Sequence, residues 1–211
     1  MKLSYAITVC NEVEEIKRLI SFLLINKRTQ DEIVVQQDEL TNPSMLTLEV
    51  QNYLNDLIFQ DKIKFVSCAL NNDFASYKNN LTENCSGDYI FQIDADEMPS
   101  EELVLNLPYI LEVNRDVDVF LVPRINTVEG LTREHVRQWR WNVNQDGWVN
   151  FPDYQWRIYR NSPSIRWKNK VHEVIEGHKT STLLPAEETY CLYHPKTIER
   201  QEKQNAYYDT L

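Results

Sequence analysis

The sequence predicts an α/β fold, with a mostly parallel central sheet, helices on both of its faces and a smaller second lobe. Strand-like and helix-like segments alternate through the first half of the chain, which is the order of a βαβ series. The strand-like runs are nearly continuous in apolar residues, as expected of parallel strands that are buried on both faces. A length of 211 residues with 42% hydrophobic residues is sufficient for one such domain.

The first half contains three clear strand patterns and two helical ones. The strands are LSYAITV at 3–9, EIVVQQD at 32–38 and KIKFVSC at 62–68. A helix is predicted after the first strand, where Asn11 can cap it and Glu14 can complete a capping box. Its apolar stripe consists of Val13, Ile16, Ile20 and Leu23. A second helix is predicted at 44–59, and its inward residues are Leu46, Val50, Leu54, Leu57 and Ile58.

The remaining elements are less regular. Asp73 is predicted to begin a third helix and Gly87 to end it in the left-handed conformation, before a fourth strand at 88–96. A helical pattern at 100–113 is interrupted at Pro108. The later elements are a strand at 117–126, a short amphipathic helix or lid at 131–142, strands at 154–161 and 164–177, and a terminal helix at 196–211. Because no linker divides the chain, residues 1–211 are predicted to form one domain with halves at about 1–98 and 99–211.

Composition excludes several classes of protein. A net charge of −10 argues against nucleic acid as a partner. With four glycines and neither G-x-G-x-x-G nor G-x-x-x-x-G-K-[ST], a glycine-cradled dinucleotide or a P-loop triphosphate is disfavoured. The apolar runs are too short for a signal peptide or a membrane span. We therefore expect a cytoplasmic protein, with peripheral association at the inner face of the membrane left open.

Positive charge is concentrated between Arg124 and Lys170. Nine basic residues stand there against four acidic ones, a net charge of +5 in an otherwise acidic chain. This predicts a cationic wall that faces an anionic ligand, with arginines such as Arg157 and Arg166 in contact with it. Ordinary surface charge is the alternative.

Three carboxylates follow the fourth strand directly, in the run YIFQIDADEMP at 89–99. Like charges held together away from water are unfavourable unless a cation lies between them. Asp94 and Asp96 are two residues apart, so they share one face of an extended chain and can bind one hard cation. Carboxylate oxygens suit Mg²⁺ or Mn²⁺, whose open positions diphosphate oxygens can fill. A solvated acidic turn is the alternative to this metal site.

Three runs of the first half resemble the nucleotide-sugar half of family 2 glycosyltransferases, which have the GT-A fold. They are SYAITVCNEVEEIKRLISFL, EIVVQQDE and FASYKNNLTENCSGDYIFQIDADEMPS. The runs DYQWRIYRNSPSIRWKNKVHEVIEG and YHPKTIERQEKQNAYY resemble the acceptor-side half of bacterial members that act on polysaccharide or lipopolysaccharide. The resemblance implies a Rossmann-like GT-A sheet with a smaller acceptor-side lobe. It also implies inverting, metal-dependent transfer of a hexosyl unit from a nucleoside diphosphate sugar, a UDP-sugar above all, to a glycan or lipid-linked glycan.

The resemblance assigns donor-binding roles to residues at the strand ends. Thr8, Asn11 and Glu12 would border the nucleotide, and Asp38 would hold the base or the ribose, although the family commonly has paired aspartates where QQDE stands here. Lys78 and Asn79 occupy the place of an Arg-Asn pair, so Lys78 would approach a phosphate or a sugar hydroxyl; a solvated helix lysine is the alternative. Asp94 and Ala95 would complete the donor site.

The resemblance also implies a histidine in the metal shell and an acid that acts as base. His172 is the first choice as the third metal ligand after Asp94 and Asp96, and His194 is the second; each could also be a structural histidine. Asp153, which follows Gly147 and Pro152, matches the usual place of the base, with Glu173 as the competing base and a turn-forming role as the alternative. The tryptophans of the stretch 133–148 could form an acceptor-sugar platform or simply pack.

Two other functions remain open on the sequence. A sugar-1-phosphate nucleotidyltransferase would share the fold, but it usually has a glycine-rich and basic loop after its first strand, where VCNEVEE stands here. A non-catalytic nucleotide- or glycan-binding module of the same fold is the other alternative.

Overall fold

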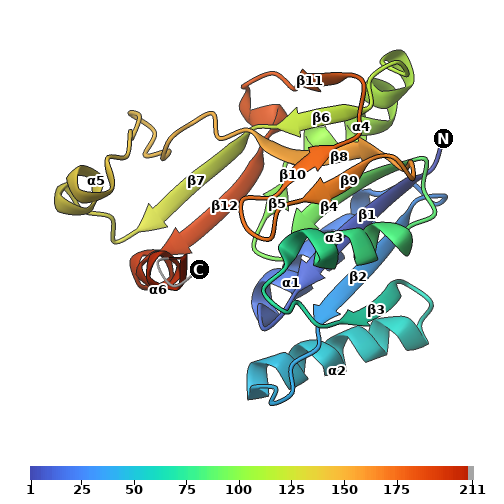
Figure 1. Ribbon diagram of the computed structural model, residues 1–211, viewed down its shortest axis with the longest axis horizontal. Helices are drawn as coiled ribbons and strands as arrows, with labels where there is room; N and C mark the ends of the chain where they lie inside the picture. Colours follow the sequence, from blue (N-terminus) through green and yellow to red (C-terminus); the bar gives the residue numbers. More distant parts are fainter. Residues whose placement is uncertain (209–211) are drawn as a thin grey trace.

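A seven-stranded mixed sheet forms the body of the protein. The computed structural model describes residues 1–208, with side chains up to residue 205, so the predicted end of the terminal helix at 209–211 lies outside the described residues. The strands lie in the order β11-β6-β8-β4-β1-β2-β3 (Figure 1). Their bounds are β1 Leu3–Val9, β2 Glu32–Asp38, β3 Lys64–Cys68, β4 Tyr89–Asp94, β6 Val119–Val122, β8 Gln155–Arg160 and β11 Ser181–Leu183.

The first four strands of the chain that enter this sheet run parallel, and β8 joins β4 in the antiparallel direction. Helices cover both faces. On one face, α1 (Val13–Asn26), α2 (Met45–Phe59) and α4 (Glu101–Val113) pack on residues such as Tyr5 and Ile7 of β1. On the other face, α3 (Phe74–Glu83) and the hairpin of β9 (Arg166–Lys168) and β10 (Val174–Glu176) pack on Ala6 and Val34. The predicted α/β fold with a largely parallel sheet and helices on both faces is confirmed.

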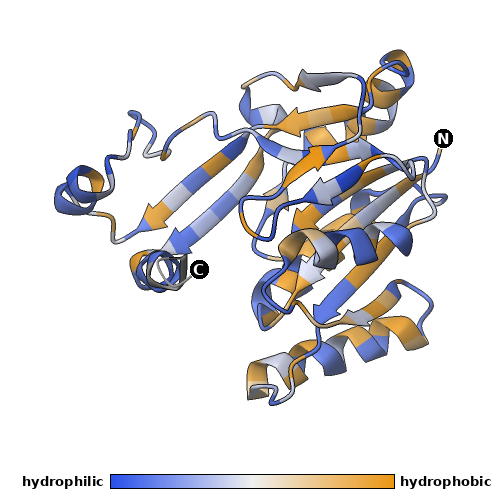
Figure 2. Cartoon of the chain, in the orientation of Figure 1, coloured by the Kyte–Doolittle hydropathy of each residue, from blue (hydrophilic) through white to orange (hydrophobic). Residues whose placement is uncertain are grey.

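A second, three-stranded sheet extends from the body. It consists of β5 (Met98–Pro99), β12 (Leu192–Thr197) and β7 (Arg124–Glu129), in that order. Figure 1 shows β7 and β12 leaving the body side by side, with α5 (Arg133–Trp139) at the far end and α6 (Ile198–Tyr208) beside β12. We call β7, α5, the loop 140–152 and β12 the arm. Figure 2 shows that the arm strands are more polar than the central strands of the body.

Six local predictions are wrong, one of them the strand predicted at 164–177, which is the hairpin of β9 and β10. Asn11 does not cap α1; instead the Glu12 carboxylate accepts hydrogen bonds from the backbone N–H groups of Cys10 and Asn11. Leu46 and Ile58 of α2 are 52% and 38% exposed, because the buried stripe of this helix runs through Val50, Leu54 and Leu57 instead.

Helix α3 ends at Glu83, before Gly87, which is not in the left-handed region. Glycine is needed at position 87 for another reason, since a Cβ atom there would lie 2.6 Å from the backbone nitrogen of Ser4. Helix α4 continues through Pro108, held by buried Leu107 and Leu111. The strand predicted at 117–126 is two strands, because the chain passes at Pro123 from the large sheet to the small one.

The described helices do not include one that is both long and apolar enough to cross a membrane. The longest, α2, has 15 residues, which is short of the roughly 20 that a bilayer requires.

Candidate functional site

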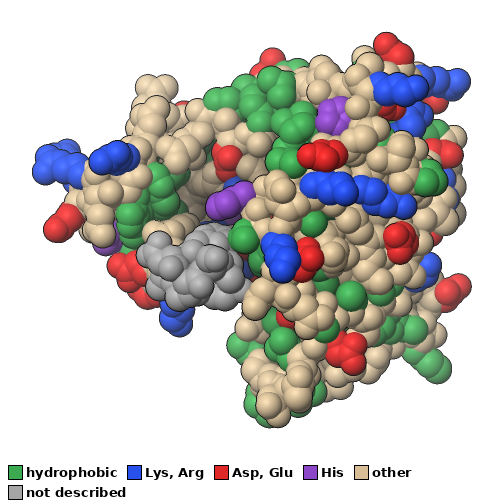
Figure 3. All heavy atoms as spheres, in the orientation of Figure 1, with side chains coloured by type: hydrophobic (Ala, Val, Ile, Leu, Met, Phe, Trp, Pro, Cys, Tyr) green, Lys and Arg blue, Asp and Glu red, His purple; other side chains and the backbone are tan. Residues whose placement is uncertain are grey.

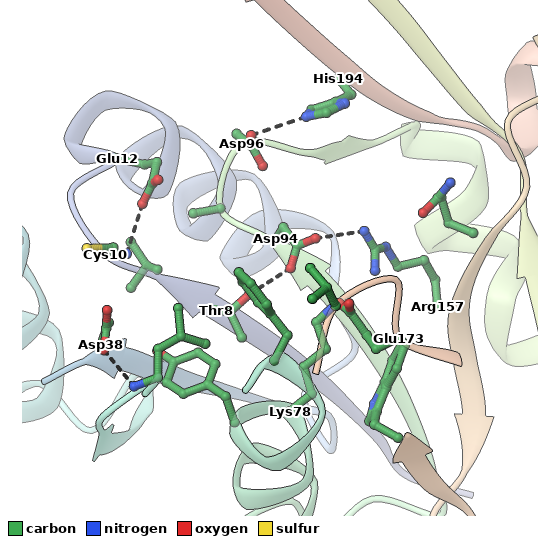
Figure 4. Close-up of a pocket in the computed structure, with 18 of the residues that line it drawn as sticks. Thr8, Cys10, Glu12, Asp38, Lys78, Asp94, Asp96, Arg157, Glu173 and His194 are labelled. Atoms are coloured by element: carbon green, nitrogen blue, oxygen red, sulfur yellow. Dashed lines mark hydrogen bonds and ion pairs between the residues drawn. The ribbon is translucent and has the colours of Figure 1, made fainter. Parts of the chain in front are cut away.

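A pocket of about 480 Å³ opens at the carboxyl ends of β1, β2 and β4 (Figure 4). In a parallel sheet this edge is the usual place for a ligand. The predicted site residues that line it are Thr8, Glu12, Asp38, Lys78, Asp94, Ala95, Asp96, His172, Glu173 and His194. Asn11 and Asp153 lie outside the lining. The structure therefore brings most of the predicted site together from six different segments of the chain.

Asp94 ends β4 and is held by two neighbours. Its carboxylate accepts hydrogen bonds from Thr8 Oγ1 and from Arg157 Nη2, each at 2.7 Å. Burial raises the pKa of Asp94, but the positive charges of Arg157 and Lys78 outweigh this and hold the pKa well below its ordinary range. Asp94 is therefore an anion at neutral pH. The sequence predicted a cation beside it, and Arg157 supplies part of that positive charge.

A buried ladder of charges continues from Asp94. Arg157 Nη2 also contacts Glu97 Oε1 at 2.7 Å, and Arg124 Nη1 contacts the same oxygen at 2.9 Å. Arg124 Nη2 in turn lies 2.7 Å from Asp153 Oδ2. The side chain of Glu97 is fully buried and that of Arg157 is 4% exposed. We call these five residues the charge ladder; it links the end of β4 to the acceptor-side segment that contains Asp153.

Within the ladder, one donor remains without a partner. Among the residues that the structure describes, Arg157 Nε is buried and has no hydrogen-bond acceptor. Arg157 lines the pocket, although its Nε atom is itself buried.

Asp96 follows Asp94 by two residues and meets a histidine of the arm. Its Oδ2 atom lies 3.2 Å from His194 Nε2 and 3.1 Å from Arg200 Nη2 of α6. Burial raises the pKa of Asp96, but His194 and then Arg200 outweigh this and lower it to about 2. The histidine that the structure brings to Asp96 is thus His194, the second choice on the sequence, whereas His172 lines the pocket next to Glu173 in the chain.

The orientation of His194 is fixed by Asn126 of β7. The Nδ2 group of Asn126 donates to Asp153 Oδ2 at 2.8 Å, so its Oδ1 atom faces His194 Nδ1, also at 2.8 Å. An amide oxygen can only accept, and therefore Nδ1 of His194 carries a proton. Nε2 is then the ring nitrogen that faces Asp96 Oδ2.

The donor set around Asp96 suits a small hard cation with few protein ligands. Within residues 1–208 there is no cluster of three or more His, Cys, Asp or Glu side chains arranged to hold a metal ion. Asp96 and His194 nevertheless bring one carboxylate oxygen and one imidazole nitrogen within 3.2 Å of each other, and a cation could replace the proton between them. Mn²⁺ accepts both ligand types, whereas Mg²⁺ prefers oxygen.

Lys78 and Glu173 form a second buried ion pair at the pocket. Lys78 is 4% exposed, so it is not a solvated helix lysine, and its Nζ atom contacts Glu173 Oε1. The ammonium group also lies 4.6 Å from the ring centroid of Trp167. Glu173, one of the two candidate bases, is consequently already bound to a cation.

Asp153, the other candidate base, is bound on both oxygens. Oδ2 accepts from Arg124 and Asn126, and Oδ1 accepts from Gln155 at 2.8 Å. Burial raises the pKa of Asp153, but the Arg124 charge and these hydrogen bonds outweigh it and lower the pKa. The carboxylate is therefore ionised at neutral pH and can accept a proton.

The opposite end of the pocket is formed by β2. Asp38 lines it and accepts a hydrogen bond from the backbone N–H of Leu70 at 2.8 Å. The two preceding glutamines are buried, and their amides bond to Tyr77 and Thr47 on the two sides of the strand. These glutamines are structural residues. Asp38 is the residue of the run QQDE whose side chain lines the pocket.

Sequence reasoning missed several residues of the site. Of the two arginines predicted to contact the ligand, Arg157 lines the pocket, as Arg124 does, and both are also part of the charge ladder; Arg166 lies 3.9 Å from Glu83 and does not line the pocket. Lys196 was not considered, although it lines the pocket and its pKa is lowered to about 8 by burial. The only local signal for Lys196 was its position two residues after His194 in the run YHPKT, which is the spacing of side chains on one face of a strand. Pro195, between them, obscures this strand pattern.

Comparisons with known proteins agree on one family and one fold. The model of the family described as glycosyl transferase family 2 matches residues 4–180. No curated protein matches the chain. Among solved structures, S. aureus TarS 1-349 is 14% identical with a TM-score of 0.62, over 92% of this chain and 60% of that one.

Two further structures of the same fragment are similar to this chain. TarS 1-349 in complex with UDP is 15% identical with a TM-score of 0.63, over 92% of this chain and 60% of that one. TarS 1-349 in complex with UDP-GlcNAc is 15% identical with a TM-score of 0.60, over 93% of this chain and 59% of that one. The chain thus spans about 60% of the length of these neighbours, and at such identities the likeness establishes the fold.

Proposed function

Because the chain belongs to glycosyl transferase family 2 and has the GT-A fold, we propose that it transfers a sugar from a nucleoside diphosphate sugar to a glycan acceptor. The observation that carries this proposal is the convergence of Asp94, Asp96 and His194 beside a pocket that extends to Asp38. Such a pocket has room for a nucleotide at one end and places carboxylates where a diphosphate would lie.

The donor that we propose is a UDP-sugar. The similar structures of TarS contain UDP and UDP-GlcNAc, and this chain has the same fold. We assign Asp38 and Thr8 to the nucleoside end, because they terminate β2 and β1. Lys78 and Arg157 are cationic groups at the pocket that suit the diphosphate.

The charge of the pocket supports metal dependence. Among the residues that the structure describes, its lining contains five acidic ones, Glu12, Asp38, Asp94, Asp96 and Glu173, and four basic ones, Lys78, Arg124, Arg157 and Lys196. Five negative and four positive charges leave −1 before any ligand binds. A diphosphate would add further negative charge, so a divalent cation is needed for balance.

We assign the cation to Asp96 and His194, with Mn²⁺ as the first candidate. When bound, it would supply Lewis-acid stabilisation of the leaving diphosphate. Asn126 orients His194 so that its Nε2 atom faces Asp96. The carboxylate of Asp94, which lies beside Arg157, adds negative charge near the proposed cation site.

The reaction that we propose inverts the configuration at the anomeric carbon. The acceptor hydroxyl loses its proton to Asp153 while its oxygen forms the new bond to the anomeric carbon. The bond from that carbon to the diphosphate oxygen breaks, and UDP leaves with the electron pair. We prefer Asp153 to Glu173 as the base because Asp153 lies on the arm side of Asp94; both carboxylates are paired with a cation, Asp153 with Arg124 and Glu173 with Lys78.

Calorimetric titration of UDP with and without Mn²⁺ tests the donor and metal assignments together. We expect Mn²⁺ to strengthen UDP binding in the wild type and to have no effect in Asp96→Asn. Asp61→Asn, an exposed position, is the matched control and should behave as the wild type. Slow hydrolysis of UDP-GlcNAc should release UDP, whereas formation of UDP-GlcNAc and pyrophosphate from UTP and N-acetylglucosamine 1-phosphate would indicate a nucleotidyltransferase instead. UDP binding that is indifferent to Mn²⁺ in the wild type would contradict the metal assignment.

A further inference from the structure

A second cavity lies in the arm, next to the main pocket. It has a volume of about 180 Å³, and its lining includes Asn126, Trp141, Asn150, Lys196 and Gln201. At about 30 Å³ per water molecule, this volume corresponds to roughly six waters, which is comparable to one sugar ring. We propose that this arm cavity binds one pyranose ring of the acceptor glycan, an inference that rests on the proposed function.

The cavity wall is built by the register of the two arm strands. His194 pairs with Asn126 and Lys196 pairs with Val128 in the parallel ladder of β7 and β12. Side chains two residues apart in a strand share a face, so Asn126, Val128, His194 and Lys196 all point to the same side of the small sheet. The polar character of this face, which is unusual for a sheet that needs a core, is explained if the face binds a ligand.

Trp141 provides an aromatic surface with a fixed position. Its ring centroid lies 4.7 Å from that of Trp139, which is stacked on His135 at 5.1 Å. His135 reaches Glu202 of α6 at 3.8 Å, and the backbone N–H of Trp141 donates to Val136 at 3.0 Å. The position of Trp141 is therefore fixed by its ring contact with Trp139 and by its backbone hydrogen bond to Val136. A rigid tryptophan face suits the apolar CH groups of a pyranose.

The rest of the lining is rich in amides. Asn150, Gln201 and Gln204 line the cavity with amides, which can donate to and accept from sugar hydroxyls. The amide of Asn126 is already bound at both ends, to Asp153 and His194, and Lys196 contacts Gln204 Oε1, which leaves the ammonium group two further donors. In the described part of the chain the lining contains no carboxylate, so a sugar with a negatively charged substituent would also be accepted.

The position of the arm cavity favours the acceptor over the nucleotide. It shares Arg124, His194, Lys196 and Gln204 with the main pocket. Figure 4 shows His194 and Asp38 on different sides of Asp94, so the arm cavity lies on the side away from the proposed nucleoside site. Asn126, which lines the cavity, is hydrogen-bonded to Asp153 at 2.8 Å. A sugar held here would have a hydroxyl close to the proposed base.

Saturation-transfer NMR on the full chain tests the proposal. The probes are methyl glycosides of glucose, galactose and N-acetylglucosamine, recorded with and without UDP and Mn²⁺. We expect signal transfer to the CH protons of at least one pyranoside. Trp141→Ala should weaken that binding by roughly five-fold, whereas Trp141→Phe should retain much of it. Trp148→Ala is the matched control, because Trp148 lies in the same loop but outside the lining.

Two outcomes would overturn the proposal while leaving the proposed function intact. One is UDP binding in a chain that shows no pyranoside signal, or the same signal in wild type and Trp141→Ala. The other is a Trp141→Ala variant that binds UDP normally but UDP-GlcNAc more weakly, because the cavity would then hold the sugar of the donor. Unchanged UDP affinity and circular dichroism in each variant establish that it folds. A wild type that fails to bind UDP would refute the proposed function, and the pyranoside signal without UDP would still test the cavity.

Discussion

Replacing Arg157 with methionine should destabilise the protein by about 3–5 kcal/mol at pH 7. The Arg157 side chain is 4% exposed, and its Nη2 atom contacts both Asp94 and Glu97 at 2.7 Å. Methionine occupies much of the same space without charge. The variant therefore removes the partner of two carboxylates, one of them fully buried, without opening a large cavity.

The magnitude follows from the two ion pairs. Unit charges about 4 Å apart attract by roughly 4 kcal/mol at an effective dielectric constant of 20, so two pairs contribute roughly 8 kcal/mol. Removing the guanidinium group also removes the cost of burying its charge, which is several kcal/mol and offsets about half of the lost attraction. Glu97 also keeps Arg124 at 2.9 Å, and Asp94 keeps the hydroxyl of Thr8 at 2.7 Å. These remaining contacts limit the loss to the stated range.

Urea unfolding followed by circular dichroism measures this difference in the free energy of unfolding. Arg166→Met is the matched control, because Arg166 lies 3.9 Å from an exposed glutamate and its loss should cost less than about 1 kcal/mol. A double variant, Arg157→Met with Asp94→Asn, should recover part of the stability since it removes the carboxylate whose ion-pair partner is lost. If Arg157→Met were no less stable than Arg166→Met, the reasoning about the charge ladder would be refuted.

Three further results are expected. Asp153→Asn should leave UDP affinity unchanged and lower the rate of sugar transfer on the order of 10² or more, and a wild-type rate would move the role of base to Glu173. Chelation of divalent metal should weaken UDP binding, and added Mn²⁺ should restore it; binding that survives chelation speaks against the metal. Burial raises the pKa of Glu32, but hydrogen bonds from Lys2, Ser4 and Ser86 outweigh this and lower it from 4.5 to about 2. Its stabilisation is therefore lost as pH falls from about 4.5 towards 2, and Glu32→Gln should reduce this acid-dependent loss by about 1–2 kcal/mol in urea titrations.

The first half of the fold was predictable because its signals are local. Each strand is a run of five to seven residues, and each is followed by a helix with an apolar stripe. Topology then places the ends of β1, β2 and β4 at one edge, which is why Thr8, Asp38 and Asp94 could be named as neighbours. The caps and the Gly87 contact were not predictable, because they depend on how the backbone of one element meets another.

The acceptor-side half was harder because its strands are short and pair over long separations. The pairing of strands β7 and β12 joins residues 68 positions apart, so the sequence could not decide between His172 and His194. The same holds for the charge ladder: no local pattern indicates that Arg124 and Arg157 share the carboxylate of Glu97. The catalytic and donor-binding roles remain predictions, now with a geometry on which they can be tested.

The basic stretch between Arg124 and Lys170 separates in the structure into two groups with different consequences. Arg124 and Arg157 are neutralised inside the charge ladder, so they cannot attract a distant anion. The exposed arginines 133, 137 and 140 lie at the tip of the arm, where Figure 3 shows basic side chains over α5. Charges attract over about 10 Å in physiological salt, so the tip acts on whatever approaches the arm and not on the nucleoside end of the pocket. Under the proposed function, this protein charge would attract an anionic acceptor, whereas the proposed divalent cation would offset the charge of the donor diphosphate.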